Sequence, residues 1–404
     1  MAQPLLAEHA SHACHEPTVA GRQRILLVVH SAKAGGSERM ALLEAQHLEE
    51  QFELLLSVPT GPLQTSFAAH GELVEAAATL PLWGASAWRW GRSSLRTLFD
   101  AVRVATLIRR RGIDVVLTNS SVCFAPVLAA KLAHVPVVVH ARDVPKSRLA
   151  PLVFALHGAL ADTVIVITGG LAPYFRRGRR ARIAQIADGI VVSGQLPRRS
   201  PANFHSPLRL CLIGGIDPRK GQDIAVEALA QLRQRGIRAT LTLVGRELDE
   251  RFAKVVRDSA QRLNVASDVE FVGEVDDAGP YLDRTDIVIA PSRGEWTPLV
   301  LMEALARGVP VVATRVGGVE DVVSDRQFGL LVGPEDPTAI ASAVAELAAD
   351  PTAATDMARR GQRHVDAHFR IERTLEELQA ELDRLLKRQA PSEEREFSPT
   401  ARVA

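Results

Sequence analysis

The sequence predicts an α/β protein built from two doubly wound domains of similar kind. Short apolar runs alternate with longer stretches of helical periodicity, which is the pattern of parallel strands joined by right-handed crossover helices. The alternation stops in a polar stretch at 192–207 and then begins again. At 404 residues the chain has room for two or three domains. We therefore expect two such domains that face a cleft.

Composition shifts along the chain predict the domain boundaries. The polar stretch has no clear periodicity and is interpreted as a linker, while both ends of the chain are polar and are interpreted as flexible tails. The predicted division is a tail at 1–21, an N-terminal domain at 22–191, the linker at 192–207, a C-terminal domain at 208–368, a helix at 369–390 that packs back towards the N-terminal domain, and a tail at 391–404.

The first half begins with Arg24–His30, a nearly continuous apolar run of the kind found in parallel strands buried on both faces. Further strands are predicted at 52–58, 113–118, 135–140, 161–168 and 182–186, and helices at 36–50, 93–111 and 122–134.

The second half repeats the pattern. Strands are predicted at 208–213, 239–244, 269–272, 286–290 and 309–313, and helices at 221–235, 249–263, 279–283, 299–307, 338–349, 351–369 and 371–388.

Composition excludes several classes of protein. The net charge is +1, whereas a general binder of nucleic acid is usually more basic, so we expect no nucleic-acid partner. Apolar runs of about 18 residues are missing, so no transmembrane helix is predicted. Cys14, Cys123 and Cys211 are few and far apart, which favours a reducing compartment such as the cytoplasm. The first twenty residues do not resemble a secretion signal.

The N-terminal tail holds a small group of potential metal ligands. His9, His12, Cys14 and His15 could bind a metal ion, but their spacing matches none of the standard zinc patterns. A disordered tail is the preferred interpretation, and no metal site is predicted there.

The pattern of Pro291–Gly308 predicts the end of a strand, a short loop and a helix. Thr297 suits the helix N-cap and Pro298 the first helical position, where a missing N–H costs nothing. The free N–H groups of Leu299 and Val300 would then face out of the helix start. Unpaired donors together with the helix dipole make such an end a site for an anion such as phosphate.

Two carboxylates bracket this helix start. Glu295 lies in the loop and Glu303 inside the helix. Glu303 is either a surface partner of Arg307, four residues later, or a partly buried group among apolar neighbours. A buried carboxylate needs donors, which the hydroxyls of a sugar or ribose would supply.

Two glycine-rich turns follow strands and are candidates for binding phosphate. Gly35-Gly36-Ser37-Glu38 either approaches a bound group or is an ordinary tight turn, and it is not the dinucleotide-binding fingerprint. In the turn at 214–221, Arg219 and Lys220 would neutralise a diphosphate at the carboxyl edge of the sheet, or form a solvated basic turn.

Polar and basic groups elsewhere give two weaker candidates. His140, Arg142 and Asp143 end a strand, where a His or Asp would face the cleft, although a strand-end cap or a surface salt bridge is an equal alternative. Basic clusters lie at Trp88–Arg96 (which includes Trp88 and Trp90), at Arg109–Arg111 and at Arg176–Arg182. They suit anionic lipids or lipid-linked acceptors, or are a solvated basic face.

Taken together, these pieces resemble the retaining family 4 glycosyltransferases of the GT-B fold, over about 24–385. The segment from Glu295 to Val312 looks like that family's E-x7-E element followed by its G-x-P-V-V strand. The other matching pieces are Gly317-Gly318 with Glu320, the turn Gly329–Asp336, the glycine loop Gly35–Glu38, and Asp188-Gly189-Ile190 in place of the usual N-G-[IV].

The resemblance implies a role for each candidate. Glu303 would hold the ribose of a nucleotide-sugar donor, Glu295 would lie by the donor sugar, and Lys220 would bind the diphosphate. The catalytic candidates are His140, Glu295 and Lys220; the donor-binding candidates are Gly36, Arg219, Lys220, Gly273, Val275, Glu295, Leu299, Val300 and Glu303; the acceptor-side candidates are Gly35, Ser37, Asn119, Arg142 and Asp143.

The chain departs from the family pattern at two places. Gly215 stands where the family often has an Arg, for which Arg219 would compensate. Thr297-Pro298 replaces the usual Phe-Gly, and the proline removes one amide.

The function implied is transfer of a sugar, with retention, from a nucleoside-diphosphate sugar to a hydroxyl of a glycan, lipid-linked glycan or small molecule. The resemblance points to synthesis of cell-surface polysaccharide or glycoconjugate, in the cytoplasm or at the inner face of the membrane. No DxD-like metal motif is evident, Asp276-Asp277 being interpreted as a helix start, so activity without metal or cofactor is expected. The alternatives are a nucleotide-sugar epimerase, a phosphorylase-like enzyme, or an inactive binding protein on the same plan.

Overall fold

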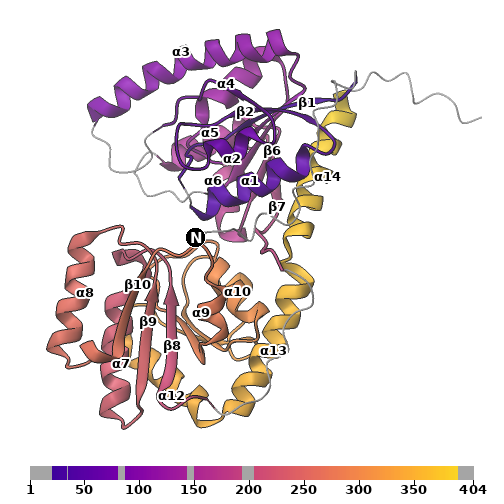
Figure 1. The fold of residues 1–404 in the computed structure, drawn as a ribbon. Helices are drawn as coiled ribbons and strands as arrows, with labels where there is room; N and C mark the ends of the chain where they lie inside the picture. Colours follow the sequence, from indigo (N-terminus) through magenta and orange to yellow (C-terminus); the bar gives the residue numbers. More distant parts are fainter. Residues whose placement is uncertain (1–20, 34, 81–86, 143–149, 193–203, 390–404) are drawn as a thin grey trace, which may run out of the picture. The chain divides into compact units, whose positions relative to one another are not determined.

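The computed structural model describes residues 21–33, 35–80, 87–142, 150–192 and 204–389 (Figure 1). It divides into two compact units. Of the described residues, the N-terminal unit comprises those from 21 to Ile186 together with those from Leu375 to 389, and the C-terminal unit comprises those in Ala187–Thr374. The chain therefore passes between the units twice, at 186/187 and at 374/375.

The N-terminal unit contains a seven-stranded parallel sheet with the order β3-β2-β1-β4-β5-β6-β7. Its strands are β1 (Arg24–Val28), β2 (Glu53–Ser57), β3 (Glu72–Val74), β4 (Val115–Thr118), β5 (Val137–Ala141), β6 (Thr163–Val166) and β7 (Arg182–Gln185). Its helices before residue 186 are α1 (Gly36–Leu48), α2 (Gln64–Ala68), α3 (Ala87–Arg111), α4 (Phe124–Ala133), α5 (Ala150–Leu160) and α6 (Ala172–Arg176), with a 3-10 turn η1 (Gly169–Leu171).

The last helix, α14 (Ile371–Gln389), completes the N-terminal unit from residue 375 onward. Leu378, Leu382 and Leu385 recur at helical spacing and are buried in the same apolar core as β1 and β2. Glu381 on the same helix pairs with Arg182 of β7 at 3.0 Å. The stripe of leucines explains why this otherwise charged helix docks on the sheet.

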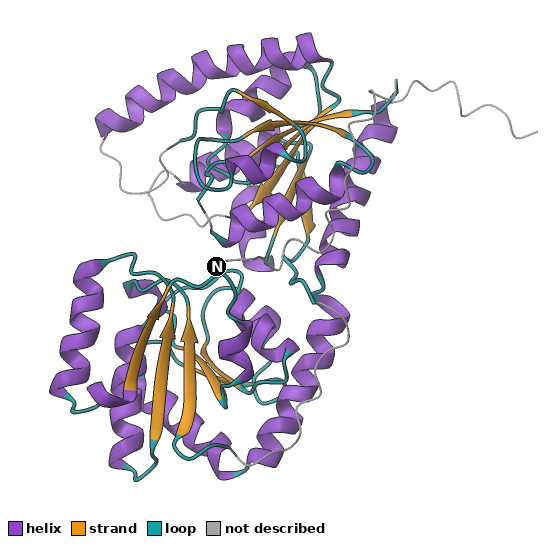
Figure 2. Cartoon of the chain, in the orientation of Figure 1, coloured by secondary structure: helices purple, strands orange, loops and turns teal. Residues whose placement is uncertain are grey.

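The C-terminal unit contains a six-stranded parallel sheet with the order β10-β9-β8-β11-β12-β13. Figure 2 shows its strands among the surrounding helices. Its strands are β8 (Leu208–Ile213), β9 (Ala239–Val244), β10 (Val269–Gly273), β11 (Ile287–Ala290), β12 (Val311–Thr314) and β13 (Leu330–Val332). Its helices are α7 (Gln222–Gln234), α8 (Glu250–Arg262), α9 (Gly279–Asp283), α10 (Leu299–Ala306), α11 (Val319–Val322), α12 (Pro337–Ala349) and α13 (Pro351–His368), with 3-10 turns η2 (Pro218–Lys220) and η3 (Ala266–Asp268).

Both faces of the C-terminal sheet are covered by helices. Ile287 points into a core shared with α7, α8 and α12, whereas the next residue, Val288, points into a core shared with α10 and α13. Strands buried on both faces have to be apolar throughout, which is why the sequence shows them as continuous runs. The doubly wound α/β fold predicted for each half is confirmed.

Each sheet has one point at which the strand order reverses. In the N-terminal unit this point lies between β1 and β4, and in the C-terminal unit between β8 and β11. Crossover connections leave in opposite directions there. Ligands of open α/β sheets bind at such a point, outside the carboxyl ends of the strands.

Some elements differ from the prediction. The sequence pattern does not predict α2, β3, α5, α6 or α11. Two of the three residues of β3 are exposed, so it has no apolar run, and α5 is apolar nearly all round, so its periodicity is weak. Within the described residues, no helix combines the length and the apolar character needed to cross a bilayer.

Candidate functional site

The two loops at the reversal point of the C-terminal sheet bring together three of the predicted donor-binding residues. Lys220 lies in the loop after β8 and Glu295 in the loop after β11, and the Lys220 ammonium donates to Glu295 Oε2. Arg219 Nη1 lies 3.7 Å from the same oxygen. Lys220 and Glu295 are 16% and 13% exposed, so the pair is largely shielded but open to a ligand.

The local sequence explains how Lys220 reaches this point. The carboxylate of Asp217 accepts from the N–H of Arg219 at 2.7 Å and so caps η2, the turn that carries both cations. Gly221 then has a φ of +71°, and a Cβ there would overlap the carbonyl oxygen of Pro291. Only glycine allows the loop after β8 to pass this close to the loop after β11.

Arg293 holds these loops in place and is not among the residues predicted from sequence. Its guanidinium makes two hydrogen bonds with Asp223 at the start of α7, at 2.8 and 3.0 Å, and pairs with Glu335 in the turn after β13. It also donates to the carbonyl of Pro218 at 2.6 Å. Hydrogen bonds first to Asp223 and then to Glu335 raise the pKa of Arg293 above its already high ordinary value. Arg293 therefore clamps the loop of Glu295 to the loop of Lys220.

Two glycines, Gly317 and Gly318, pack against the backbone of the loop that carries Glu295. Gly317 has a φ of +55°, and a Cβ on it would overlap the carbonyl oxygen of Glu295. Gly318 donates its N–H to the same carbonyl at 2.9 Å, and a Cβ on it would overlap the carbonyl oxygen of Trp296. The turn that resembles the family's glycine turn thus acts on the backbone that carries Glu295.

The start of α10 differs from the prediction. Pro298, not Thr297, is the N-cap, and no side chain caps the helix. The N–H of Leu299 donates to the carbonyl of Thr297 at 2.9 Å, so it is not free for a ligand as predicted. The hydroxyl of Thr297 lies 3.5 Å from the carboxylate of Asp188. Because Pro298 occupies the N-cap position, the hydroxyl of Thr297 faces Asp188 and does not cap the helix.

The other donor-binding residues predicted in the C-terminal unit lie on α10 and at the end of β10. Glu303 is half-buried on α10, and Arg307 pairs with Asp283 at 3.3 Å. Gly273 ends β10 with a φ of +86° and open space around it, and Val275 is half-buried two residues later. A Cβ at Gly215 would overlap Leu248, so the glycine that replaces the family's arginine is packed against an apolar side chain.

At the reversal point of the N-terminal sheet, the loop after β1 meets the loop after β4. Asn119 donates its Nδ2 to the carbonyl of Ser37 at 3.0 Å and turns its Oδ1 towards His30 Nδ1 at 3.2 Å. Glu38 accepts from the hydroxyl of Ser37 at 2.9 Å, and its other oxygen lies 3.4 Å from His30 Nε2. A Cβ at Gly35 would overlap the carboxylate of Glu38. Gly36 is the first residue of α1.

His140 lies on β5, the strand next to β4, and is fully buried, so the expectation that its side chain faces a cleft is wrong. Its Nδ1 lies 3.1 Å from the carboxylate of Glu44 on α1, which Arg142 also contacts at 2.6 Å. Burial by itself would raise the pKa of Glu44, but Arg142 and His140 lower it to about 2. His140 lies on the face of β5 that is turned towards α1, where the carboxylate of Glu44 meets it.

Some predicted features lie outside the described residues. These are Asp143, the group His9, His12, Cys14 and His15, and the side chains of Trp88 and Trp90. Within the described part of the chain, α3 carries four large apolar side chains that are 58% exposed or more: Leu95, Leu98, Phe99 and Val102. The segment Arg176–Arg182 is mostly exposed, and Arg182 is paired with Glu381.

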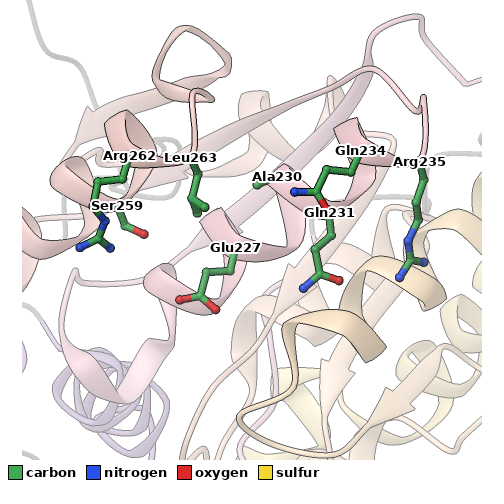
Figure 3. A pocket seen from close by; sticks show the side chains of 8 residues that line it. All are labelled: Glu227, Ala230, Gln231, Gln234, Arg235, Ser259, Arg262 and Leu263. Carbon is green, nitrogen blue, oxygen red and sulfur yellow. The ribbon is translucent and has the colours of Figure 1, made fainter.

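One pocket of about 500 Å³ lies against α7 and α8 (Figure 3). Gln234 and Arg235 from the end of α7, and Arg262 and Leu263 from the end of α8, are among its lining residues. Helices of a doubly wound sheet run antiparallel to the strands, so these helix ends lie at the amino edge of the sheet. The pocket is therefore separate from the candidate site at the carboxyl edge.

Comparison with known proteins agrees with this arrangement. A family model described as "Glycosyltransferase Family 4" matches residues 34–193, and one described as "Glycosyl transferases group 1" matches residues 207–350. The second match contains both loops of the Lys220–Glu295 pair. The chain belongs to glycosyltransferase family 4. The GT-B interpretation of the sequence is confirmed.

Individual relatives of this glycosyltransferase are distant. Glycogen synthase from Mycobacterium tuberculosis is 31% identical over 47% of this chain and 45% of its own length. A GDP-mannose-dependent α-(1-6)-phosphatidylinositol monomannoside mannosyltransferase from the same organism is 34% identical over 41% of this chain and 44% of its own. HepE from Anabaena, solved with UDP, has a TM-score of 0.76 at 22% identity and covers 90% of this chain and 100% of its own. The matches span about half the length of the curated relatives.

Proposed function

We propose that this glycosyltransferase moves a sugar, with retention of anomeric configuration, from a nucleoside-diphosphate sugar to a hydroxyl acceptor. The observation that carries the proposal is the partly exposed Lys220–Glu295 pair, with Arg219 beside it, at the reversal point of the C-terminal sheet. Two cations and a carboxylate at this edge suit a diphosphate and a sugar hydroxyl at once. The names of the relatives, which act on glycogen and on a lipid-linked mannoside, support a glycan or lipid-linked glycan as acceptor, in polysaccharide or glycoconjugate synthesis.

The pair gives a physical account of donor binding. Without a donor, Lys220 and Glu295 neutralise one another. A diphosphate carries more negative charge than one carboxylate and competes for Lys220 and Arg219, so its arrival releases Glu295 to accept hydrogen bonds from the donor sugar. As the sugar–oxygen bond breaks, charge grows on the leaving diphosphate, and cations already in place lower the barrier.

The remaining contacts with the nucleotide-sugar donor are assigned to other residues of the C-terminal unit. Glu303, half-buried on α10, is assigned to the ribose hydroxyls, which supply the donors that a shielded carboxylate needs. The backbone from Gly273 to Val275 is assigned to the base, because it ends β10 with open space around Gly273. Of the two backbone N–H groups at the start of α10, that of Val300 is assigned to the nucleotide-sugar donor, because the N–H of Leu299 already bonds to the carbonyl of Thr297.

The test of the function needs no knowledge of the acceptor. UDP-, GDP- and ADP-sugars are incubated with the purified protein, and slow hydrolysis of each donor is measured by release of the nucleoside diphosphate. We expect one base to be preferred. A converted but unhydrolysed nucleotide sugar would indicate an epimerase, and a protein that binds no nucleotide by calorimetry would indicate an inactive binding protein.

Catalysis without a metal ion is part of the proposal. Lys220 and Arg219 supply the positive charge that a metal would otherwise bring to the diphosphate. Donor hydrolysis should therefore continue in EDTA. Activity that vanished in EDTA and returned with manganese would overturn this part of the mechanism.

We further propose that the protein works in the cytoplasm and that α3 contacts the anionic inner face of the membrane. The helix contains seven arginines and one aspartate. Leu95, Leu98, Phe99 and Val102 follow helical spacing and are 58%, 59%, 72% and 61% exposed, so they form one apolar stripe on a basic helix. Such a helix lies in the interface of an anionic bilayer. A second copy of the same helix would be repelled by its charge.

Cosedimentation with vesicles tests this surface. The full-length protein should sediment with phosphatidylglycerol-containing vesicles, weakly with phosphatidylcholine alone, and less in high salt. Replacing both Leu98 and Phe99 by Ser should abolish sedimentation. The control is Leu248→Ser, which removes an apolar side chain that is 54% exposed in the other unit. Equal sedimentation of the two variants would contradict the proposal.

A further inference from the structure

The carboxyl edge of the N-terminal sheet carries a polar group that the proposed donor site does not use. It consists of His30, at the end of the run that forms β1, with Glu38 from the first turn of α1 and Asn119 from the loop after β4. His30 is 18% exposed, Glu38 is 7% exposed and Asn119 is fully buried. The imidazole is the most exposed member of the group. His140, the histidine that the sequence analysis favoured, is fully buried.

The hydrogen bonds around Asn119 determine which nitrogen of His30 carries a proton. Asn119 Nδ2 donates to the carbonyl of Ser37, so its Oδ1 faces His30 Nδ1. An amide oxygen only accepts, so Nδ1 has to be the donor. In the neutral imidazole Nε2 is then an acceptor, because one ring nitrogen donates and the other accepts.

This tautomer places two hydrogen-bond acceptors, His30 Nε2 and Glu38 Oε1, next to each other. His30 Nε2 lies 3.4 Å from Glu38 Oε1. The other oxygen of Glu38 already accepts from the hydroxyl of Ser37 at 2.9 Å. A neutral imidazole and a carboxylate at this distance lack a proton between them, and a hydroxyl that donates to them supplies one.

We propose that His30 and Glu38 form the subsite that binds the acceptor hydroxyl. This inference rests on the proposed sugar transfer. The hydroxyl donates to His30 Nε2 or Glu38 Oε1, which leaves the lone pairs of its oxygen available to attack a sugar. Asn119 is a positioning residue, since it holds the tautomer of His30 and does not itself touch the acceptor. Gly35 leaves the space in which the Glu38 carboxylate lies.

The test uses water as the hydroxyl, so no natural acceptor has to be known. The donor is whichever UDP-, GDP- or ADP-sugar the wild-type protein hydrolyses fastest, and binding of the matching nucleoside diphosphate is measured by calorimetry. His30→Asn keeps a group that reaches Asn119 but has nothing at the Nε2 position. The turnover number for hydrolysis should fall about tenfold, which corresponds to the loss of one hydrogen bond worth about 1.4 kcal/mol in the transition state. Nucleotide affinity should not change.

Two further variants separate this role from a structural one. His30→Gln restores an amide near the Nε2 position and should recover part of the turnover. Glu38→Gln, which is isosteric, places an amide that donates to Nε2 and so closes the subsite; it should lower turnover as His30→Asn does. The matched control is His70→Asn, because His70 is also 18% exposed and pairs with Glu49 at 2.9 Å in the same unit.

The outcomes are distinct. Hydrolysis at the wild-type rate in folded His30→Asn would overturn the subsite, and would mean that His30 and Glu38 form a closed imidazolium–carboxylate pair. Loss of nucleotide affinity in the same variant would also overturn it, because the group would then belong to the donor site. If the wild-type protein hydrolyses no donor and binds no nucleotide, the proposed function fails first and this subsite fails with it.

Discussion

Acidification should loosen the loop after β4, because a buried and uncharged histidine holds it. His157 on α5 is fully buried, and its Nε2–H donates to the carbonyl of Ser121 at 2.8 Å. Its Nδ1 has no hydrogen-bond partner among the described residues. Burial lowers the pKa of His157 from 6.5 to about 4, which the bond to Ser121 only partly opposes. The same loop carries Asn119, so its stability bears on the proposed acceptor subsite.

The sign and size of the effect follow from proton linkage. Between pH 6.5 and pH 4 the unfolded chain binds a proton at His157 and the folded chain does not. The stabilisation is therefore complete above pH 6.5 and is lost as the pH falls towards 4. From about pH 7.5 to about pH 5 the loss at this one site is about 2 kcal/mol. His157→Gln keeps a donor for Ser121 and does not titrate, so this part of the loss should be absent from the variant.

Hydrogen exchange measured by mass spectrometry is the suitable assay, because it reports the N-terminal unit separately from the C-terminal unit. Peptides from α4 and α5 are compared between the two pH values, after correction for the intrinsic effect of pH on exchange. The control is His134→Asn, which changes an exposed histidine at a φ of 60° that asparagine tolerates. If protection in wild type and His157→Gln falls by the same amount, within about 0.5 kcal/mol, the assignment to His157 is wrong.

Four other substitutions test the remaining structure. Glu44→Gln removes the charge that buried Arg142 needs and should cost about 3 kcal/mol of stability at neutral pH, seen as lost exchange protection in α1; an unchanged pattern would contradict the buried pair. Lys220→Ala and Glu303→Ala should each lower kcat/KM for the donor by about 10²–10³ without unfolding the protein, and near-normal rates in either would refute its role. Gly317→Ala should cost about 1–3 kcal/mol and weaken donor binding, since its φ is +55° and a Cβ overlaps the Glu295 carbonyl; Gly294→Ala, which meets open space, is the control.

Local patterns predicted the strands and helices of the C-terminal unit closely. The strands at 208–213 and 239–244 and the helix at 279–283 have the predicted ends. Strands buried on both faces have to be continuous apolar runs, and helices on the sheet have to carry one apolar stripe. Both patterns can therefore be recognised in a short stretch of sequence. Short elements at the sheet edges, such as β3, lack that constraint and were not predicted.

The chemistry of Pro291–Gly308 was predicted in part. The half-buried position of Glu303 and the shared location of Lys220 and Glu295 agree with the sequence analysis. The helix start does not, because the backbone turn at Pro298 uses the N–H of Leu299. Whether an amide is free depends on the dihedral angles of the residue before it, which residue preferences do not specify.

By itself, the sequence determined the fold class, the family and the sheet edge at which the proposed donor-binding residues lie, since each of these is set by periodicity or by short motifs. Only the tertiary structure decided which of two strand-end histidines is accessible and which carboxylate each one meets. His30 and His140 both end apolar strands, but one lies at the reversal point of the sheet and the other under α1. Strand order depends on contacts between residues far apart in the chain, so it decides accessibility where local pattern does not.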